Sequence, residues 1–157
     1  MGELTQNESK LLRQFVRQAA YKPIILTVGE TDISIPINIF SERKDCWVVN
    51  ANMGDDYALC MLAKQMNWNL ISINARVTDS QTIAKAFPQL WWFDIVFVND
   101  NPGHVEEHLA WEKHRHLNGV FMYKNYNVPN DKAILDDYIS RSNMKIRGQA
   151  DNLVAFR

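Results

Sequence analysis

Two histidines and a glutamate in the middle of the chain have the residue types and the spacing of a metal hydrolase site. His104 and His108 are four residues apart, and Glu107 directly precedes the second histidine, so the segment fits the pattern H-x-x-E-H. Residues four apart share a face of a helix, where two imidazoles could hold a zinc ion and the carboxylate could act as a base. The pattern is short and follows an apolar stretch that predicts a strand, so we expect the match to be a coincidence.

The length and the composition predict one domain over residues 1–157, of which residues 1–20 form an N-terminal helix. Hydrophobic residues make up 46% of the chain and charged residues 22%, which is ordinary globular usage. With 17 basic and 18 acidic side chains the formal net charge is −1, so no general binding of nucleic acid is expected. The polar N-terminus and the lack of a long apolar run argue against a membrane span and predict a cytoplasmic protein.

Short apolar runs alternate with amphipathic stretches along the chain. The predicted strands are residues 24–28, 46–51, 69–74, 94–98 and 119–123. The predicted helices are residues 8–20, a helix from Ser34, residues 54–66 and 81–86, a helix after Pro102, and residues 129–139. Pro36 would interrupt a central strand but is tolerated in the first turn of a helix. Residues 144–156 predict two short strands joined by a turn at Gly148 to Asp151.

This alternation predicts an α/β fold. Strands that alternate with helices form a mostly parallel sheet with helices on both faces. The expected architecture is a Rossmann-like, doubly wound sheet of about seven strands that ends in an antiparallel hairpin.

Ligands of such sheets bind beyond the carboxyl ends of the strands. Five polar segments follow the five predicted strands: GETDIS, NANMGDD, NARVTD, NDNPGH and KNYNVPND. Each segment alone is explained equally well by turn formation, because Asn and Asp are common turn residues. Their occurrence at the same edge of one sheet favours a ligand site.

The stretch from Phe93 to His104, FDIVFVNDNPGH, resembles the fourth-strand motif F-D-hydrophobic-hydrophobic-F-I-D-G-D-H of class I S-adenosylmethionine-dependent methyltransferases. Members that methylate oxygen atoms of small molecules are the most similar. The segment HLNGVFMYKNYN is similar to the strand-five segment of the family, and VGETDIS occupies the position of its glycine-rich cofactor loop. The resemblance covers nearly all of the chain after about residue 20.

The resemblance implies S-adenosylmethionine as the cofactor and assigns candidate residues to it. The cofactor-binding candidates are Gly29, Glu30, Thr31, Asp32, Ser34, Asn50, Asn52, Asn74, Ala75 and Asn99. The catalytic candidates are His104, Lys124 and Asp100. His104 could act as a general base on a hydroxyl group, since histidine titrates near neutral pH, or it could be a solvent-exposed residue at the start of a helix. Lys124 could be a base if burial favours its neutral form, or it could pair with Asp100 or Asp32.

Several positions depart from the family pattern. Gly29 is the only glycine in the cofactor loop, and Asn50 or Asn52 stands where an acidic residue normally ends the second strand. Asn99 and Lys124 match the carboxylates that hold a divalent cation in metal-dependent members, so no metal is expected.

The sequence therefore predicts a metal-independent methyltransferase that acts on an oxygen or nitrogen of a small-molecule substrate. The alternative is a non-catalytic protein of the same fold that serves as a binding or regulatory subunit. Exposed apolar surface on the first helix or the C-terminal hairpin would allow a homodimer.

The remaining reactive side chains are expected to be structural. His108, His114 and His116 are interpreted as part of a solvated helix face. Cys46 and Cys60 lie in apolar surroundings without a C-x-x-C pair, which predicts two buried, reduced thiols.

Overall fold

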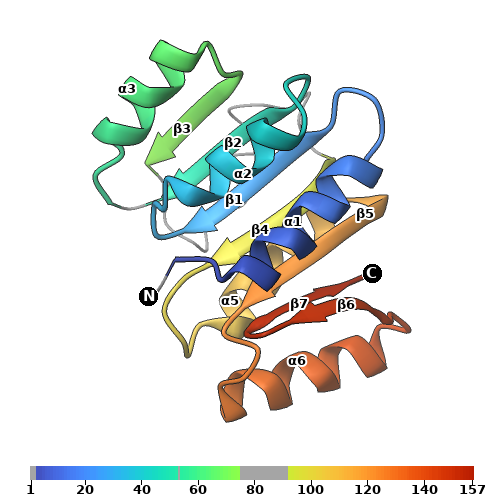
Figure 1. The fold of residues 1–157 in the computed structure, drawn as a ribbon. Helices are drawn as coiled ribbons and strands as arrows, with labels where there is room; N and C mark the ends of the chain where they lie inside the picture. The colour runs from blue at the N-terminus through green and yellow to red at the C-terminus, as the bar shows by residue number, and fades with distance from the viewer. Residues whose placement is uncertain (1–2, 53, 75–91) are drawn as a thin grey trace.

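The computed structural model describes residues 3–52, 54–74 and 92–157 (Figure 1). The strands are β1 (Ile24–Gly29), β2 (Trp47–Asn52), β3 (Leu70–Asn74), β4 (Phe93–Asn99), β5 (Arg115–Lys124), β6 (Ile146–Ala150) and β7 (Leu153–Phe156). The helices are α1 (Gln6–Gln18), α2 (Ser34–Glu42), α3 (Tyr57–Met66), α5 (Val105–Leu109), the 3-10 helix η2 (Ala110–His114) and α6 (Pro129–Arg141).

The strands of this part of the chain form one seven-stranded sheet in the order β3-β2-β1-β4-β5-β7-β6. The pairs from β3 to β5 are parallel, and β7 is antiparallel to both β5 and β6. The strand order reverses between β1 and β4, which is the position where doubly wound sheets bind ligands. The predicted Rossmann-like fold with a C-terminal hairpin is confirmed.

Buried side chains form one cluster on each face of the sheet. The neighbouring residues Ile25 and Leu26 belong to different clusters, because successive side chains of a strand point to opposite faces. One cluster includes the apolar stripe of α1 and residues of α2, which lie across the same face in Figure 1. The other cluster includes Val105, Trp111 and Leu135 from α5, η2 and α6. Helices therefore cover both faces, as predicted.

The start of α1 is joined to the C-terminal hairpin through a buried carboxylate. The hydroxyl of Thr5 accepts the backbone N–H of Glu8 at 3.1 Å, and the Glu8 carboxylate accepts the backbone N–H of Thr5 at 2.9 Å. This capping box satisfies two N–H groups at the helix start. The other oxygen of Glu8 accepts the backbone N–H of Asn152 at 3.1 Å.

Several predicted boundaries differ from the structure. The helix expected from Gly54 begins at Tyr57, and the helix after Pro102 is the short α5 followed by η2. The hairpin turn lies at residues 151–152 instead of 148–151, and Gly148 is inside β6. The predicted helix at residues 81–86 lies outside the described residues. Within the described ranges, no helix combines the length and the apolar character needed to cross a membrane.

Candidate functional site at the carboxyl edge of the sheet

A pocket of about 470 Å³ lies where β1 and β4 end and α2 begins. The predicted residues Glu30, Thr31, Asp32, Ser34 and Asn99 all line it, together with Glu3, Ile33 and Ile37. The structure therefore brings five of the ten predicted cofactor residues to one place. Of these, Asn99 is the last residue of β4, and the others belong to the loop after β1 and the first turn of α2.

Three buried oxygen atoms around this pocket have no hydrogen-bond partner among the described residues. They are Thr31 Oγ1, Ser34 Oγ and Asn99 Oδ1. A buried polar atom without a partner costs on the order of 1–3 kcal/mol, so such atoms are rare in folded proteins. All three atoms belong to residues that line one pocket, and their hydrogen-bonding capacity is unused among the described residues.

The sharp turn from β1 into this pocket depends on Gly29. Its φ of 111° belongs to the left-handed region that side chains rarely adopt. A Cβ atom here would overlap the carbonyl oxygen of Asn99 and lie 2.7 Å from its carbonyl carbon. Close contact with β4 therefore requires a glycine at residue 29, independently of any ligand in the pocket.

Two acidic residues of the loop have structural partners. Asp32 Oδ1 accepts the backbone N–H of Ser34, the first residue of α2, at 2.9 Å, and the Asp32 carbonyl accepts the backbone N–H of Ile35 at 3.1 Å. Glu30 is exposed and accepts a hydrogen bond from the side chain of Asn101 at 3.1 Å, which links the loops after β1 and β4.

The ends of β2 and β3 carry a ladder of polar side chains. Thr27 donates to Asn50 Oδ1 at 2.7 Å, and the amide nitrogens of Asn50 and Asn52 lie 3.5 and 3.4 Å from Ser72 Oγ. The hydroxyl of Ser72 in turn donates to Asp56, which immediately precedes α3. Asn50 and Asn52 are thus buried and engaged within the protein.

Sequence reasoning did not single out Asp56, whose carboxylate accepts the hydrogen bond of Ser72 next to the end of β2. Its role depends on Ser72, which is distant in the sequence and adjacent only because β2 and β3 pair in parallel. Asn74 ends β3 and is exposed, and Ala75 lies outside the described residues.

Asp100 follows β4 and is held by a buried histidine. The Nε2 atom of His108 lies 2.9 Å from Asp100 Oδ2, and the side chain of His108 is 0% exposed. Burial lowers the pKa of His108, and the hydrogen bond to Asp100 opposes this shift. The His108 ring is therefore neutral at neutral pH and donates from Nε2, which leaves its buried Nδ1 without a partner in the described part of the chain.

The prediction of a solvated helix face was wrong for His108 and His114. Both are buried, and burial lowers the pKa of His114 as well. His108 lies on α5 with its ring against that of Tyr123, and His114 ends the 3-10 helix with its ring near that of Trp111; a regular helical pattern does not predict this change of helix type.

The loop between β4 and α5 is tied to α6 by Asp131. Its two carboxylate oxygens accept the backbone N–H of Gly103 at 3.1 and 3.4 Å, and the hydroxyl of Tyr123 donates to it at 3.1 Å. Burial, with the nearby carboxylate, strongly raises the pKa of Tyr123, so the phenol stays protonated. The side chain of Asn125 also donates to the backbone carbonyl of Asp100. These contacts fix the backbone on either side of Asp100.

His104 and His108 do not form a metal site with the described residues. His104 precedes α5, has a side chain 48% exposed and contacts Glu107 at 3.0 Å, whereas His108 is buried against Asp100. No group of three His, Cys, Asp or Glu side chains that could hold a metal ion occurs within the described ranges. The zinc hydrolase pattern is therefore not supported by the geometry.

Lys124 contacts the N-terminal segment instead of either predicted partner. Its Nζ atom donates to the backbone carbonyl of Glu3 at 3.0 Å and lies 3.7 Å from Glu8 Oε1. Of the described carboxylates, Glu8 forms its ion pair, and Asp100 and Asp32 do not. This buried pair gives Lys124 a structural role.

Comparison with solved structures identifies the fold. A protein from Staphylococcus aureus assigned as a caffeoyl-CoA O-methyltransferase superposes with a TM-score of 0.74 at 15% identity over 99% of this chain and 84% of its own. A precorrin-6y C5,15-methyltransferase from Geobacter metallireducens gives 0.67 at 14% identity, with 98% and 86% covered. The mycinamycin-pathway methyltransferase MycE, in complex with Mg and SAH, gives 0.65 at 14% identity, with 94% and 44% covered. No protein-family model and no curated protein matches the sequence.

The chain therefore has the class I methyltransferase fold. The resemblance found in the fourth and fifth strands of the sequence is confirmed at the level of the fold.

Proposed function

We propose that the protein binds S-adenosylmethionine at the carboxyl edge of β1, β2 and β4 and transfers its methyl group to an oxygen or nitrogen of a small molecule without a metal ion. The observation that supports this most is the set of three unpaired buried oxygens, from Thr31, Ser34 and Asn99, in the pocket at the point of strand reversal. The fold of the neighbours, which include an SAH complex, supports the same cofactor.

The residues of the pocket fit the polar parts of this cofactor. Hydroxyl groups of Thr31 and Ser34 can both donate and accept hydrogen bonds, and the Asn99 oxygen can accept one, so together they can receive an ammonium and a carboxylate. In the loop between β2 and α3, Asp56 offers a carboxylate that would accept hydrogen bonds from ribose hydroxyls.

When bound, the cofactor supplies a methyl group already activated by its sulfonium. The protein then has mainly to position the acceptor in line with this group and to exclude water. We assign to Asp100, which directly follows β4, the role of orienting the acceptor or taking its proton. Its Oδ2 is held by His108, and its Oδ1 takes part in no hydrogen bond with a described residue. His104 is a second candidate base, because its exposed ring lies on the same loop.

A screen for turnover tests this function. The purified protein would be incubated with S-adenosylmethionine and pools of phenols, catechols and amines, and S-adenosylhomocysteine would be measured by mass spectrometry. We expect acceptor-dependent product that falls by about 10²-fold or more in Asp100→Asn, because a positioned base contributes this much. Product formation without any acceptor dependence would contradict the proposal.

A second candidate is a non-catalytic subunit that binds the cofactor without turnover. The observation that favours it is that Lys124, a predicted catalytic residue, forms an ion pair with Glu8 and donates to the backbone carbonyl of Glu3. Cofactor binding without product from any acceptor pool would support this candidate over the enzyme.

A further inference from the structure

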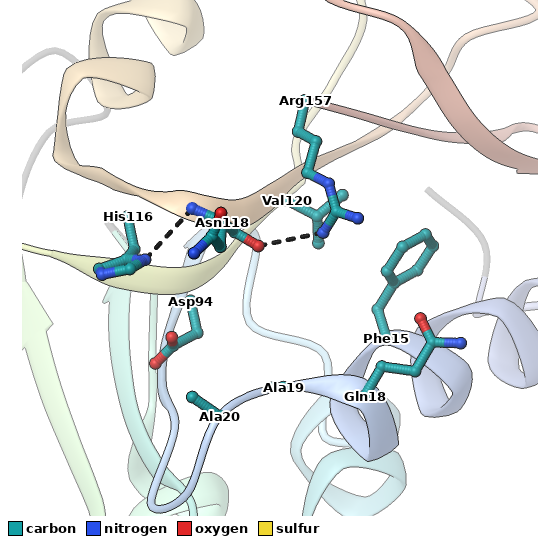
Figure 2. Close-up of a pocket in the computed structure, with 9 residues that line it drawn as sticks. All are labelled: Phe15, Gln18, Ala19, Ala20, Asp94, His116, Asn118, Val120 and Arg157. Carbon is teal, nitrogen blue, oxygen red and sulfur yellow. Dashed lines mark hydrogen bonds between the residues drawn. The ribbon is translucent and has the colours of Figure 1, made fainter.

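The edge of the sheet opposite to the candidate cofactor site carries another pocket, of about 310 Å³ (Figure 2). It lies where α1 ends and β4 begins, beside Arg157, which follows β7. Asp94 in its wall is the second residue of β4, whereas Asn99 in the cofactor-edge pocket is the last. The two pockets therefore lie at opposite ends of one strand.

One wall of this pocket is a bulge in β5. Phe93 pairs with Arg115 and Ile95 pairs with Val120, so the four residues 116–119 of β5 stand opposite the single residue Asp94 of β4. Bulges of this kind redirect side chains away from the regular strand. Here the bulge brings His116 and Asn118 into the pocket wall (Figure 2).

The bulge is held by contacts outside the pocket. Nη1 of Arg115 donates to the carbonyl oxygens of residues 116, 117 and 119 at 3.1, 3.3 and 2.9 Å. Nε and Nη2 of Arg115 donate to Glu112 at 2.8 and 2.6 Å, and the pair is largely buried. Gly119 allows the close approach, since a Cβ there would lie 2.7 Å from the carbonyl oxygen of Asp94. The pocket wall is therefore preorganised before any ligand arrives.

The pocket carries opposite charges on two segments. Asp94 Oδ2 accepts the backbone N–H of Ile24 at 2.9 Å, and Oδ1 takes part in no hydrogen bond with a described residue. Nη1 of Arg157 donates to the carbonyl of Asn118 at 3.0 Å, and the other N–H groups of this guanidinium have no partner within the described ranges. Figure 2 shows Asp94 and Arg157 apart from each other, with Val120 beside Arg157 and Phe15 projecting from α1.

His116 adds a neutral donor. Its Nδ1 accepts the backbone N–H of Asn118 at 3.2 Å, so the neutral ring carries its proton on Nε2. The pocket thus combines a carboxylate, a guanidinium, a neutral N–H donor and apolar side chains.

We propose that this pocket binds a small zwitterion, a molecule with a primary ammonium that pairs with Asp94 and a carboxylate that pairs with Arg157. A zwitterion would pair with both Asp94 and Arg157, whereas a ligand with one charge would pair with only one of them. The apolar floor contacts the carbon chain between the two charged groups. The volume is at the lower end for small-molecule sites, which suits a ligand of amino-acid size.

Amide chemical-shift titration of the full chain tests this site. The probes are L-leucine, 4-aminobutyrate and 6-aminohexanoate, in which the two charges are separated by increasing lengths of chain. Butyrate and butylamine, each with one charge, are the controls. We expect at least one zwitterion to give saturable shifts at the amides of Ile24, Asn118 and Val120, and the two controls to give none.

Matched variants test the two charges separately. Asp94→Asn keeps an oxygen acceptor for the Ile24 N–H, and Arg157→Gln changes an exposed residue, so both proteins should fold. Each should weaken zwitterion binding by about tenfold or more. Asp137→Asn and Arg141→Gln alter an exposed ion pair on α6 and should leave the affinity unchanged. The proposal is overturned if no zwitterion binds at millimolar concentration, if either control binds as well, or if all four variants behave alike.

Discussion

The Nε2 atom of His108 lies 2.9 Å from the Oδ2 atom of Asp100, so a fully buried imidazole holds the first residue after β4. Asp100 also lies beside the turn after β1, since a Cβ atom added at Gly29 would be 3.0 Å from the Cβ atom of Asp100. This pair connects the packing of one face of the sheet to the candidate site. It also makes the stability of the protein depend on pH.

Burial lowers the pKa of both His108 and His114 in the folded protein. Acid then favours the unfolded chain, where a histidine binds a proton near its ordinary pKa of about 6.5. The free energy of unfolding should therefore fall as the pH drops below about 6.5, by up to about 1.4 kcal/mol per pH unit for each histidine until the folded-state pKa is reached. Denaturant unfolding between pH 5 and pH 7 measures this slope. His108→Gln should reduce it, and equal slopes in the two proteins would contradict the assignment.

Gly29 is expected to be essential for the fold. Gly29→Ala places a Cβ against the carbonyl of Asn99 and keeps a φ that side chains avoid, so it should destabilise the protein by about 3 kcal/mol. Gly54→Ala is the control, because a Cβ at residue 54 meets no atom within 4 Å. Chemical unfolding curves give the free energy of unfolding of both variants. A Gly29→Ala protein as stable as the Gly54→Ala control would contradict the close contact between residue 29 and Asn99. A loss of cofactor binding in a Gly29 variant would not by itself identify the ligand site.

Lys124 is expected to stabilise the fold and to play no part in cofactor binding. Lys124→Met leaves the buried Glu8 carboxylate without its ion-pair partner and should cost about 3 kcal/mol or more. Lys132→Met removes an exposed lysine paired with Asp136 and should change stability little. Chemical denaturation and cofactor titration would be measured on both variants. A Lys124→Met protein that is stable but no longer binds the cofactor would contradict this expectation and would indicate that Lys124 takes part in cofactor binding.

The two cysteines should differ in reactivity. Cys46 is buried, and burial raises its pKa to about 12, whereas Cys60 is exposed on α3, although partial burial and the nearby Asp56 raise its pKa as well. The thiolate is the reactive form, so a thiol reagent should modify Cys60 in the folded protein and Cys46 only after unfolding. Mass spectrometry of the labelled peptides measures this, and labelling of both thiols in the folded protein would contradict the structure. The prediction of two buried thiols was wrong for Cys60.

The fold was predictable because its signals are local. Apolar runs such as residues 94–98 coincide with strands. Pro36 correctly indicated a helix where the alternating isoleucines alone would have predicted a strand. Because parallel strands have their carboxyl ends at one edge of the sheet, the predicted topology also placed Thr31, Ser34 and Asn99 at the same edge, where they line one pocket.

The partners of individual side chains were not predictable, because they depend on segments far apart in the sequence. Lys124 meets Glu8 only because α1 crosses the sheet, and Asp56 meets Ser72 only because β3 pairs with β2. The pocket at the opposite edge depends on the bulge of β5, and no pattern in the sequence predicts this bulge.

Titration calorimetry with S-adenosylhomocysteine tests the cofactor site most directly, using wild type, Ser34→Ala and Ser41→Ala. Ser34 Oγ is a buried, unpaired atom of the pocket, whereas Ser41 is exposed and donates to the Ile37 carbonyl at 2.5 Å. We predict micromolar binding to wild type and Ser41→Ala, and binding weaker by roughly fivefold in Ser34→Ala, which corresponds to one hydrogen bond of about 1 kcal/mol. No binding at millimolar ligand, or equal affinities in the two serine variants, would contradict a cofactor site in this pocket.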